Sequence, residues 1–217
     1  TAANSPYIVT SGLVITTGVT LTIEPGVEVQ SEYDGPWNVY GTLLAEGTPT
    51  QPITFTRGSS SYWGGIQIAS GAHARLTYVT LERGGYYGSY RPLRIASDDV
   101  QVVHSVIRDG YGSDAVFIAD GASPIISNTQ ILNNNGPAIY IADIASDPVL
   151  VNNVISGNTY DWLSLPGGIL PADRVWGLGW ATTVLPHRVR NSVTIPVTYT
   201  LTIEPGVEVQ SEYDGPW

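Results

Sequence analysis

Two short sequence patterns alternate along the middle of the chain with a period of about 24 residues. The first pattern is an aliphatic residue, a variable residue, Ile, Ala and then Ser or Asp, and its four copies begin at Ile66, Leu93, Val116 and Ile139. The second is a six-residue pattern with aliphatic ends, whose copies begin at Leu76, Val102, Ile126 and Leu150. Each pattern has the inward and outward alternation of a short strand. A tandem period of this length predicts a coil that closes and repeats.

Equivalent aliphatic residues of successive coils are expected to stack into buried columns. One column holds Leu76, Val102, Ile126 and Leu150, and another holds Leu81, Ile107, Ile131 and Ile155. Asn128 and Asn152 share a further column, which predicts an internal amide ladder. A fully buried aliphatic side chain contributes roughly 1.5–3 kcal/mol. Several coils are therefore needed to offset the backbone entropy of so many turns.

The composition favours strands joined by turns and excludes several classes of function. The 217 residues include 24 Gly and 15 Pro, and no apolar run approaches the length needed to cross a bilayer. The formal net charge of −10 argues against a nucleic-acid partner. The chain has no Cys, so disulfides, thiolate zinc sites and Cys nucleophiles are excluded.

A β-sandwich or a propeller is the alternative architecture for strands this short. Antiparallel hairpins typically carry Asn-Gly or Asp-Gly between closely spaced strands. Asp109-Gly110 and Asp120-Gly121 do occur, but each lies at a fixed phase of the 24-residue period. This regularity favours the stacked coil.

Several segments resemble the right-handed parallel β-helix repeat proteins of bacteria, in the pectate-lyase-like superfamily. They are Leu21–Val29, Gly41–Gly47, Pro52–Thr56, Trp63–Ile66 and Ala122–Asn128. The resemblance covers nearly the whole chain, and it implies an all-β, right-handed parallel β-helix of the tandem-repeat surface or extracellular type. The family includes lyases, hydrolases, epimerases, adhesins and large surface proteins, so the fold alone does not indicate one activity.

A second, longer repeat is superimposed on the coils. Residues 21–37 return without change at 201–217, an offset of 180 residues. We therefore expect a β-helix unit over 1–163, a connector leading into the next unit over 164–186, and the start of a second unit over 187–217 that repeats 7–37. Either the chain belongs to a natural array of such units, or one period of a polymer is written out with overlap. A following unit would cover the strand edges and apolar column ends of the one before it.

No catalytic residues, metal ligands or cofactor-binding residues are predicted. The densest polar group is Asp98, Asp99, His104, Arg108, Asp109 and Asp114, and ordinary turn chemistry explains most of it. The chain has no Lys to act as a base, and the Gly-Gly-x-Gly-x-Asp calcium repeat is missing. An enzyme is therefore the minority interpretation.

A cluster of aromatic residues near turns is the candidate recognition surface. It contains Tyr62, Trp63, Tyr86, Tyr87 and Tyr90. Aromatic rings on a groove stack on sugars or meet another protein. The alternative is that Trp63 closes one end of a coil and the tyrosines cover it.

Three functions are therefore open at this point. The first is a structural repeat of a secreted or cell-surface fibre, whose partner is another unit of the same polymer. The second is a carbohydrate-binding adhesin module with a polysaccharide partner. The third is a polysaccharide lyase or hydrolase. We expect an extracellular or cell-surface location.

Overall fold

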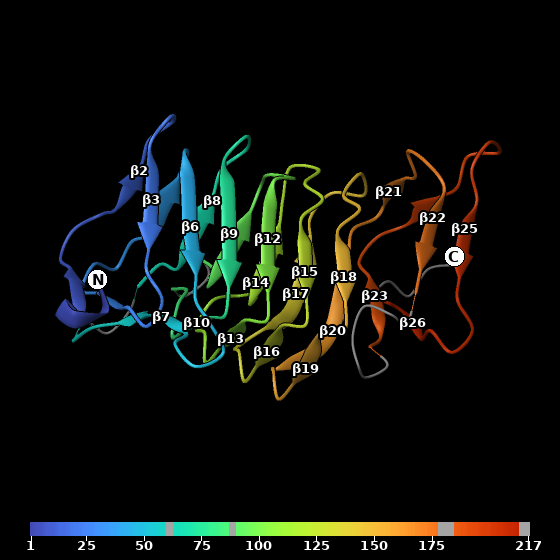
Figure 1. Cartoon of the computed structure of the whole chain (residues 1–217). Coiled ribbons are helices and arrows are strands. Elements are labelled where there is room, and N and C mark those ends of the chain that lie inside the picture. Colours follow the sequence, from blue (N-terminus) through green and yellow to red (C-terminus); the bar gives the residue numbers. More distant parts are fainter. Residues whose placement is uncertain (60–62, 87–89, 178–184, 213–217) are drawn as a thin grey trace.

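The chain winds into a parallel β-solenoid whose coils follow one another along a single long axis (Figure 1). The computed structural model describes residues 1–59, 63–86, 90–177 and 185–212. A short 3-10 helix, η1 (Ala2–Asn4), precedes the first coil, and the rest of the regular structure in these ranges is strand. The all-β, parallel arrangement predicted from the 24-residue period is confirmed.

Most coils contribute one strand to each of three sheets, which we name A, B and C. Sheet A contains, in order, β1 (Tyr7–Val9), β4 (Glu28–Ser31), β7 (Ile53–Arg57), β10 (Val79–Glu82), β13 (Val106–Arg108), β16 (Gln130–Leu132) and β19 (Val154–Ser156). Sheet B contains β2 (Val14–Ile15), β5 (Trp37–Val39), β8 (Ile66–Ile68), β11 (Leu93–Ile95), β14 (Val116–Ile118), β17 (Pro137–Ile141), β20 (Tyr160–Leu165), β23 (His187–Val189) and β26 (Val209–Ser211). Sheet C contains β3 (Thr20–Ile23), β6 (Thr42–Glu46), β9 (His73–Thr77), β12 (Val100–Val103), β15 (Ile125–Ser127) and β18 (Val149–Val151). Two further pairs join β21 (Gly168–Ile169) to β24 (Val193–Thr194) and β22 (Arg174–Trp176) to β25 (Leu201–Ile203).

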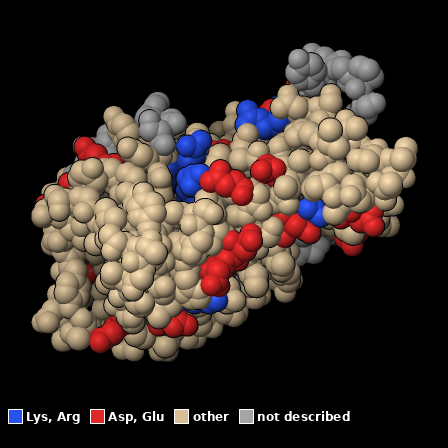
Figure 2. Space-filling view, turned by 90° about the horizontal axis from the view of Figure 1, so that it is seen from above, with Lys and Arg blue, Asp and Glu red and all other residues tan. Residues whose placement is uncertain are grey.

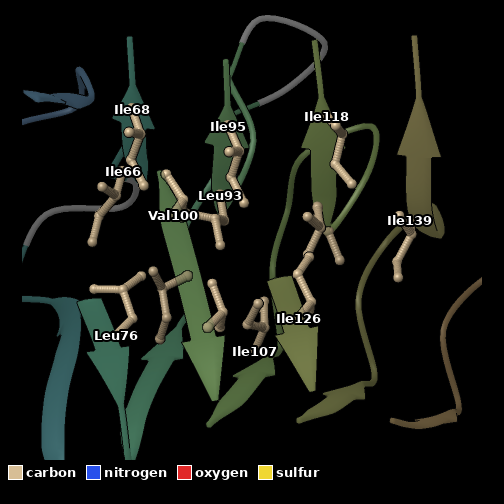
Figure 3. Packing of buried hydrophobic residues seen from close by; sticks show 14 of the residues in the cluster. Ile66, Ile68, Leu76, Leu93, Ile95, Val100, Ile107, Ile118, Ile126 and Ile139 are labelled. Carbon is tan, nitrogen blue, oxygen red and sulfur yellow. The ribbon is translucent and has the colours of Figure 1, made fainter. Parts of the chain in front are cut away.

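The core consists of aliphatic columns that run along the solenoid axis. Val102 pairs in register with Leu76 on one side and Ile126 on the other, and Ile126 pairs in turn with Leu150. In sheet A the same register joins Leu81, Ile107, Ile131 and Ile155. All eight residues are buried. Figure 3 shows members of these columns facing the inward side chains of sheet B across the interior.

The second sequence pattern forms two strands around a corner, where we expected one strand. In each of four coils the chain leaves sheet C and enters sheet A through a single residue with positive φ: Tyr78 at 49°, His104 at 51°, Asn128 at 50° and Asn152 at 53°. One left-handed residue turns the chain sharply. The aliphatic residues on both sides of the corner then point into the core.

The second copy of the long repeat continues the solenoid. β23 pairs with β20, and β26 pairs with β23. The pairing of His187 with Val209 in the second copy matches that of Tyr7 with Val29 in the first. However, β1 and β4 lie in sheet A, whereas β23 and β26 extend sheet B.

The columns lead to a stability prediction for Ile131, which is fully buried in β16. The Ile131→Ala variant should lower the free energy of unfolding by about 2–5 kcal/mol, because it opens a cavity between two coils. Val151→Ala, at an exposed position of β18, should change the same quantity by no more than about 0.5 kcal/mol. Urea denaturation of both variants measures the difference, and equal losses would contradict the assignment of the core.

Candidate functional site

The structure divides the predicted aromatic cluster. Trp63 is fully buried, its indole N–H donates to the carbonyl of Glu82 at 3.0 Å, and its ring lies 5.3 Å from that of Trp37. Trp63 is thus a core residue and not a surface recognition residue, because it packs against Trp37 and lies beside Gly84 and Gly85 of the next coil. Tyr86 is exposed and Tyr90 is half-buried. Tyr62 and Tyr87 lie outside the described residues.

The predicted amide ladder is wrong by one residue. Asn128 and Asn152 are exposed, since they occupy the left-handed corner positions. The next residue of each coil points inward, and the buried polar row consists of Ser105, Thr129 and Asn153. The Asn153 side-chain oxygen accepts from the backbone N–H of Thr129 at 3.1 Å. A second buried amide pair joins Asn134 Nδ2 to Asn158 Oδ1 at 2.9 Å.

The polar residues considered for catalysis do not form one site. Asp99 binds His73 and Arg75 of the preceding coil, and the hydrogen bond from His73 is the main reason that the pKa of Asp99 is lowered. Arg108 donates to Glu82 at 2.6 Å. His104 stacks on Tyr78 with ring centroids 5.0 Å apart. These pairs link successive coils, so Asp99, His104 and Arg108 each have a separate partner.

The outward face of sheet B carries a different cluster, built from a column of paired residues. The column comprises Asn38, Gln67, Arg94, Phe117, Tyr140, Ser164, Arg188 and Gln210, one from each successive strand from β5 to β26. The Phe117 and Tyr140 rings stack with centroids 5.1 Å apart. Ser164 is the smallest side chain of the column, and it lies between Tyr140 and Arg188.

The small side chain of Ser164 leaves a hollow of about 370 Å³, which we call the sheet B pocket. This volume is within the range of small-molecule sites. Its aromatic lining is Phe117, Tyr140, Tyr160 and Trp162, and its charged lining is Arg91, Arg188, Arg190, Asp114 and Glu212. The Tyr160 and Trp162 rings stack at 4.2 Å. The lining residues run from Arg91, before β11, to Glu212, after β26, so the pocket crosses several coils.

Arginines fix the aromatic rings of the pocket from several sides. The Arg188 guanidinium lies 4.1 Å from the centre of the Trp162 ring, and that of Arg190 lies 5.0 Å from the Tyr140 ring. The Arg91 guanidinium lies 4.6 Å from the Phe117 ring. Such cation–π contacts hold both partners in place. Glycine at position 65 allows the backbone of Arg91 to approach closely, since a Cβ there would lie 2.2 Å from the carbonyl oxygen of Arg91.

The two carboxylates of the pocket have different surroundings. Burial raises the pKa of the Asp114 carboxyl, and the neighbouring Arg91, whose Nε lies 3.2 Å from Asp114 Oδ2, opposes the shift only in part. Glu212 is shared by two arginines, with Arg188 Nε at 3.0 Å from one oxygen and Arg190 Nε at 3.1 Å from the other. Charged groups therefore surround a partly aromatic hollow.

The face of the molecule drawn in Figure 2 carries few positively charged side chains. Figure 2 shows a largely uncharged surface with arginines in a few clusters and acidic side chains in a band across the face. Within the described ranges, no three His, Asp or Glu side chains are grouped so as to hold a metal ion. No helix in the part of the chain that the structure describes is long and apolar enough to cross a membrane.

Comparison with known proteins identifies the family. Residues 50–169 match the family model described as the right handed beta helix region. The chain belongs to this family. No significant match to a curated protein or to a solved structure was found.

Two apolar hollows lie in the terminal coils of the β-helix. The first, of about 370 Å³, is lined by Leu13, Leu21, Ile23 and Val29 among others. The second, of about 410 Å³, is lined by Val193, Leu201, Ile203 and Val209 together with Ile195 and Trp176. Four residues of the second hollow are the repeat equivalents of those four residues of the first, 180 positions apart.

Sequence analysis missed the sheet B pocket of the β-helix, although two signals for it exist. Phe117 and Tyr140 occupy the variable second position of the first pattern, which is an outward column. Arg188 and Arg190 stand where the first copy of the long repeat has Ile8 and Thr10. Aligning coils by their outward positions would have identified the first pair, and comparing the two copies would have identified the second.

The corner geometry predicts different costs for two neighbouring amides of the β-helix. Asn153→Gly should lower the free energy of unfolding by about 1–3 kcal/mol or more, because it leaves the buried N–H of Thr129 without its acceptor. Asn152→Gly should change it by less than about 0.5 kcal/mol, since glycine readily adopts the positive φ of this corner. Thermal or urea unfolding of the two variants tests this, and a larger loss for Asn152→Gly would contradict the assignment.

Proposed function

We propose that this right-handed β-helix is a structural repeat unit of a secreted or cell-surface array, in which 180-residue repeats stack end to end. The observation that carries the proposal is the internal junction, where β23 of the second copy adds to β20 of the first unit in one continuous sheet. The backbone hydrogen bonds of a solenoid are satisfied coil upon coil, so a repeat that adds in this way continues the same structure.

The packing at the junction supports a stable contact. Leu163 and Leu165 of β20 are buried, and they pair with His187 and Val189, which are also buried. Burial lowers the pKa of His187, so the imidazole favours its neutral form in this contact. The inward side chains at the junction are thus as buried as those of the coils on either side of it.

The two hollows are the surfaces through which two separate chains would stack, whereas within one array the coil of the first hollow would pack on residues 160–176 of the preceding repeat, as its second copy does. Both present Leu, Ile and Val side chains that the aliphatic columns of another repeat would match. The occupant that we propose is another repeat of this same sequence, because the internal junction already joins two copies by the same kind of strand pairing. A fibre built in this way would draw its stiffness from hydrogen bonds along its axis.

A pair of single-end variants tests the stacking. Leu21→Asp places a charge in the first hollow, and Leu201→Asp places the same charge at the equivalent residue of the second. We expect the unmodified chain to form end-to-end particles in negative-stain microscopy at high concentration, because its two apolar ends can bury each other. In a variant, stacking at the altered end would bury a lone carboxylate, which is unfavourable. Each variant alone should remain a single unit, and an equimolar mixture should give pairs that grow no further.

The mixture also serves as the control for folding, since only folded variants can pair through their unmodified ends. Circular dichroism should show strand content equal to that of the unmodified chain. A chain that stays a single unit at every concentration would contradict the proposal. Particles of more than two units in the mixture would contradict the end-to-end geometry.

Carbohydrate binding is the second candidate function, and the sheet B pocket favours it. The pocket brings the stacked Tyr160 and Trp162 rings next to hydrogen-bonding groups, and this combination suits a sugar ring with its apolar face and polar rim. Tyr160 is 45% exposed, so its ring is accessible from solvent.

Tyr160→Ala tests the second function without touching the core. The variant should weaken the binding of a ligand from an oligosaccharide panel by about two- to tenfold in isothermal titration, because it removes one ring contact. Tyr199→Ala removes a ring of similar exposure outside the pocket and should leave binding unchanged. Equal effects of the two variants would argue against a sugar site at this pocket.

A further inference from the structure

Two arginines of the second copy contact aromatic rings of the first unit, across strands β17, β20 and β23 that follow one another in sheet B (Figure 1). The Arg188 guanidinium on β23 lies 4.1 Å from the centre of the Trp162 ring on β20. The Arg190 guanidinium lies 5.0 Å from the Tyr140 ring on β17, one strand further back. Ser164 lies between Tyr140 and Arg188 in the outward column, and its small side chain leaves room for this contact. The two copies therefore meet through outward side chains as well as through the core.

Glu212 completes this network from the side of the second copy. One carboxylate oxygen lies 3.0 Å from Arg188 Nε, and the other lies 3.1 Å from Arg190 Nε. A carboxylate shared in this way holds both guanidinium groups in place beside the rings. The Arg188 side chain is only 29% exposed, so its attraction to the Trp162 ring is less screened by water than at a fully exposed site.

The first copy of the repeat has the same strand pairing without these arginines. β1 pairs with β4 as β23 pairs with β26, residue for residue. Ile8 and Thr10 stand at the positions of Arg188 and Arg190, and Ile8 is 47% exposed. The pairing of the strand with the coil that follows it thus needs no arginine. The contribution of the two arginines lies in the contact with the preceding unit.

The carboxylates at the junction would oppose a strand that lacks the arginines. Glu212 is identical to its repeat equivalent Glu32, which accepts a hydrogen bond from Ser59 at 2.9 Å in the first copy. Asp114 lines the same hollow as Glu212, and burial raises the pKa of the Asp114 carboxyl. With Ile and Thr on the strand, Glu212 would line this hollow without either of its cations, which is unfavourable.

We propose that Arg188 and Arg190 are the specificity-determining residues of the junction, and that the Tyr140 and Trp162 rings select a following repeat with two basic residues, two positions apart, on its first strand. A repeat with the Ile and Thr of the first copy at these positions is rejected, because it loses both ring contacts and leaves Glu212 without its cations. This inference rests on the array of stacked repeats proposed above. It adds which repeat fits this end of the unit.

The repeat itself supplies the test variant. Arg188→Ile with Arg190→Thr installs the residues of the first copy at the same strand positions. Ile and Thr are both favoured in strands, so strand propensity alone predicts no loss. Arg75→Gln with Arg83→Gln is the matched control, because it also removes two positive charges and neither residue lines the sheet B pocket or belongs to β23.

Hydrogen exchange of the Leu163 amide, followed by NMR, measures opening of the junction, because this N–H donates to the carbonyl of Pro186, next to β23, at 3.0 Å. The Ala142 amide donates to the carbonyl of Ile118 at 2.8 Å and reports on the first unit alone. We expect the test variant to exchange the Leu163 amide at least about tenfold faster than the unmodified chain, since two cation–π contacts and their ion pairs are lost. The Ala142 amide should exchange at an unchanged rate, and the control variant should alter neither amide.

Trp162→Leu tests the same contact from the side of the first unit. It should also accelerate exchange of the Leu163 amide, after correction for the intrinsic rate beside the new residue. Adding Arg188→Ile to this variant should then have a smaller effect than in the unmodified chain, because the ring that Arg188 contacts is already absent. Additive effects in this double-mutant cycle would contradict a direct contribution of the pair.

Three results of the exchange measurement would overturn the inference, and they separate it from the stacked array. Full protection of the Leu163 amide in the test variant would remove the selection by the arginines and leave the array intact. Equal acceleration in the test and control variants would show a general effect of charge. An unprotected Leu163 amide in the unmodified chain would contradict the continuous junction, and with it both the selection and the array.

Discussion

The contact between equivalent aliphatic residues one coil apart is the interaction on which the whole structure depends. Each such residue is buried by its neighbours above and below, so no coil is stable alone and the free energy accumulates along the axis. Leu76, Val102, Ile126 and Leu150 show the result, since all four are buried and paired in register. This constraint fixes the inward positions of every coil and leaves the outward positions free to carry chemistry.

The period of the sequence was enough to predict the solenoid and the register of its columns. A fixed offset between aliphatic residues indicates that these residues lie above one another in successive coils. It was not enough to place the polar residues. A single left-handed residue at a corner changes which neighbour points inward, so Asn152 faces solvent while Asn153 is buried. Trp63 was misplaced for a related reason, since its burial depends on Trp37 and Gly85 of other coils, which no local sequence pattern indicates.

The sheet B pocket escaped prediction because its members are far apart in the sequence and lie at positions that vary from coil to coil. Sheet B runs from β2 to β26, and one outward column brings Phe117, Tyr140, Ser164 and Arg188 into a line. The pocket exists where a small residue interrupts large ones. Function in such a fold is therefore encoded by differences between coils, whereas the fold is encoded by their likeness.

The same reasoning applies at the scale of the long repeat. Segments 21–37 and 201–217 are identical, so they carry no information about which repeat should follow which. Order in an array must come from residues that differ, and at this junction those include His187, Arg188 and Arg190. His187 is buried against β20, while the two arginines reach Glu212 and the rings of the preceding unit. The strand pairing of β20 with β23 thus supplies the stacking, and the substituted residues of β23 make this junction chemically distinct.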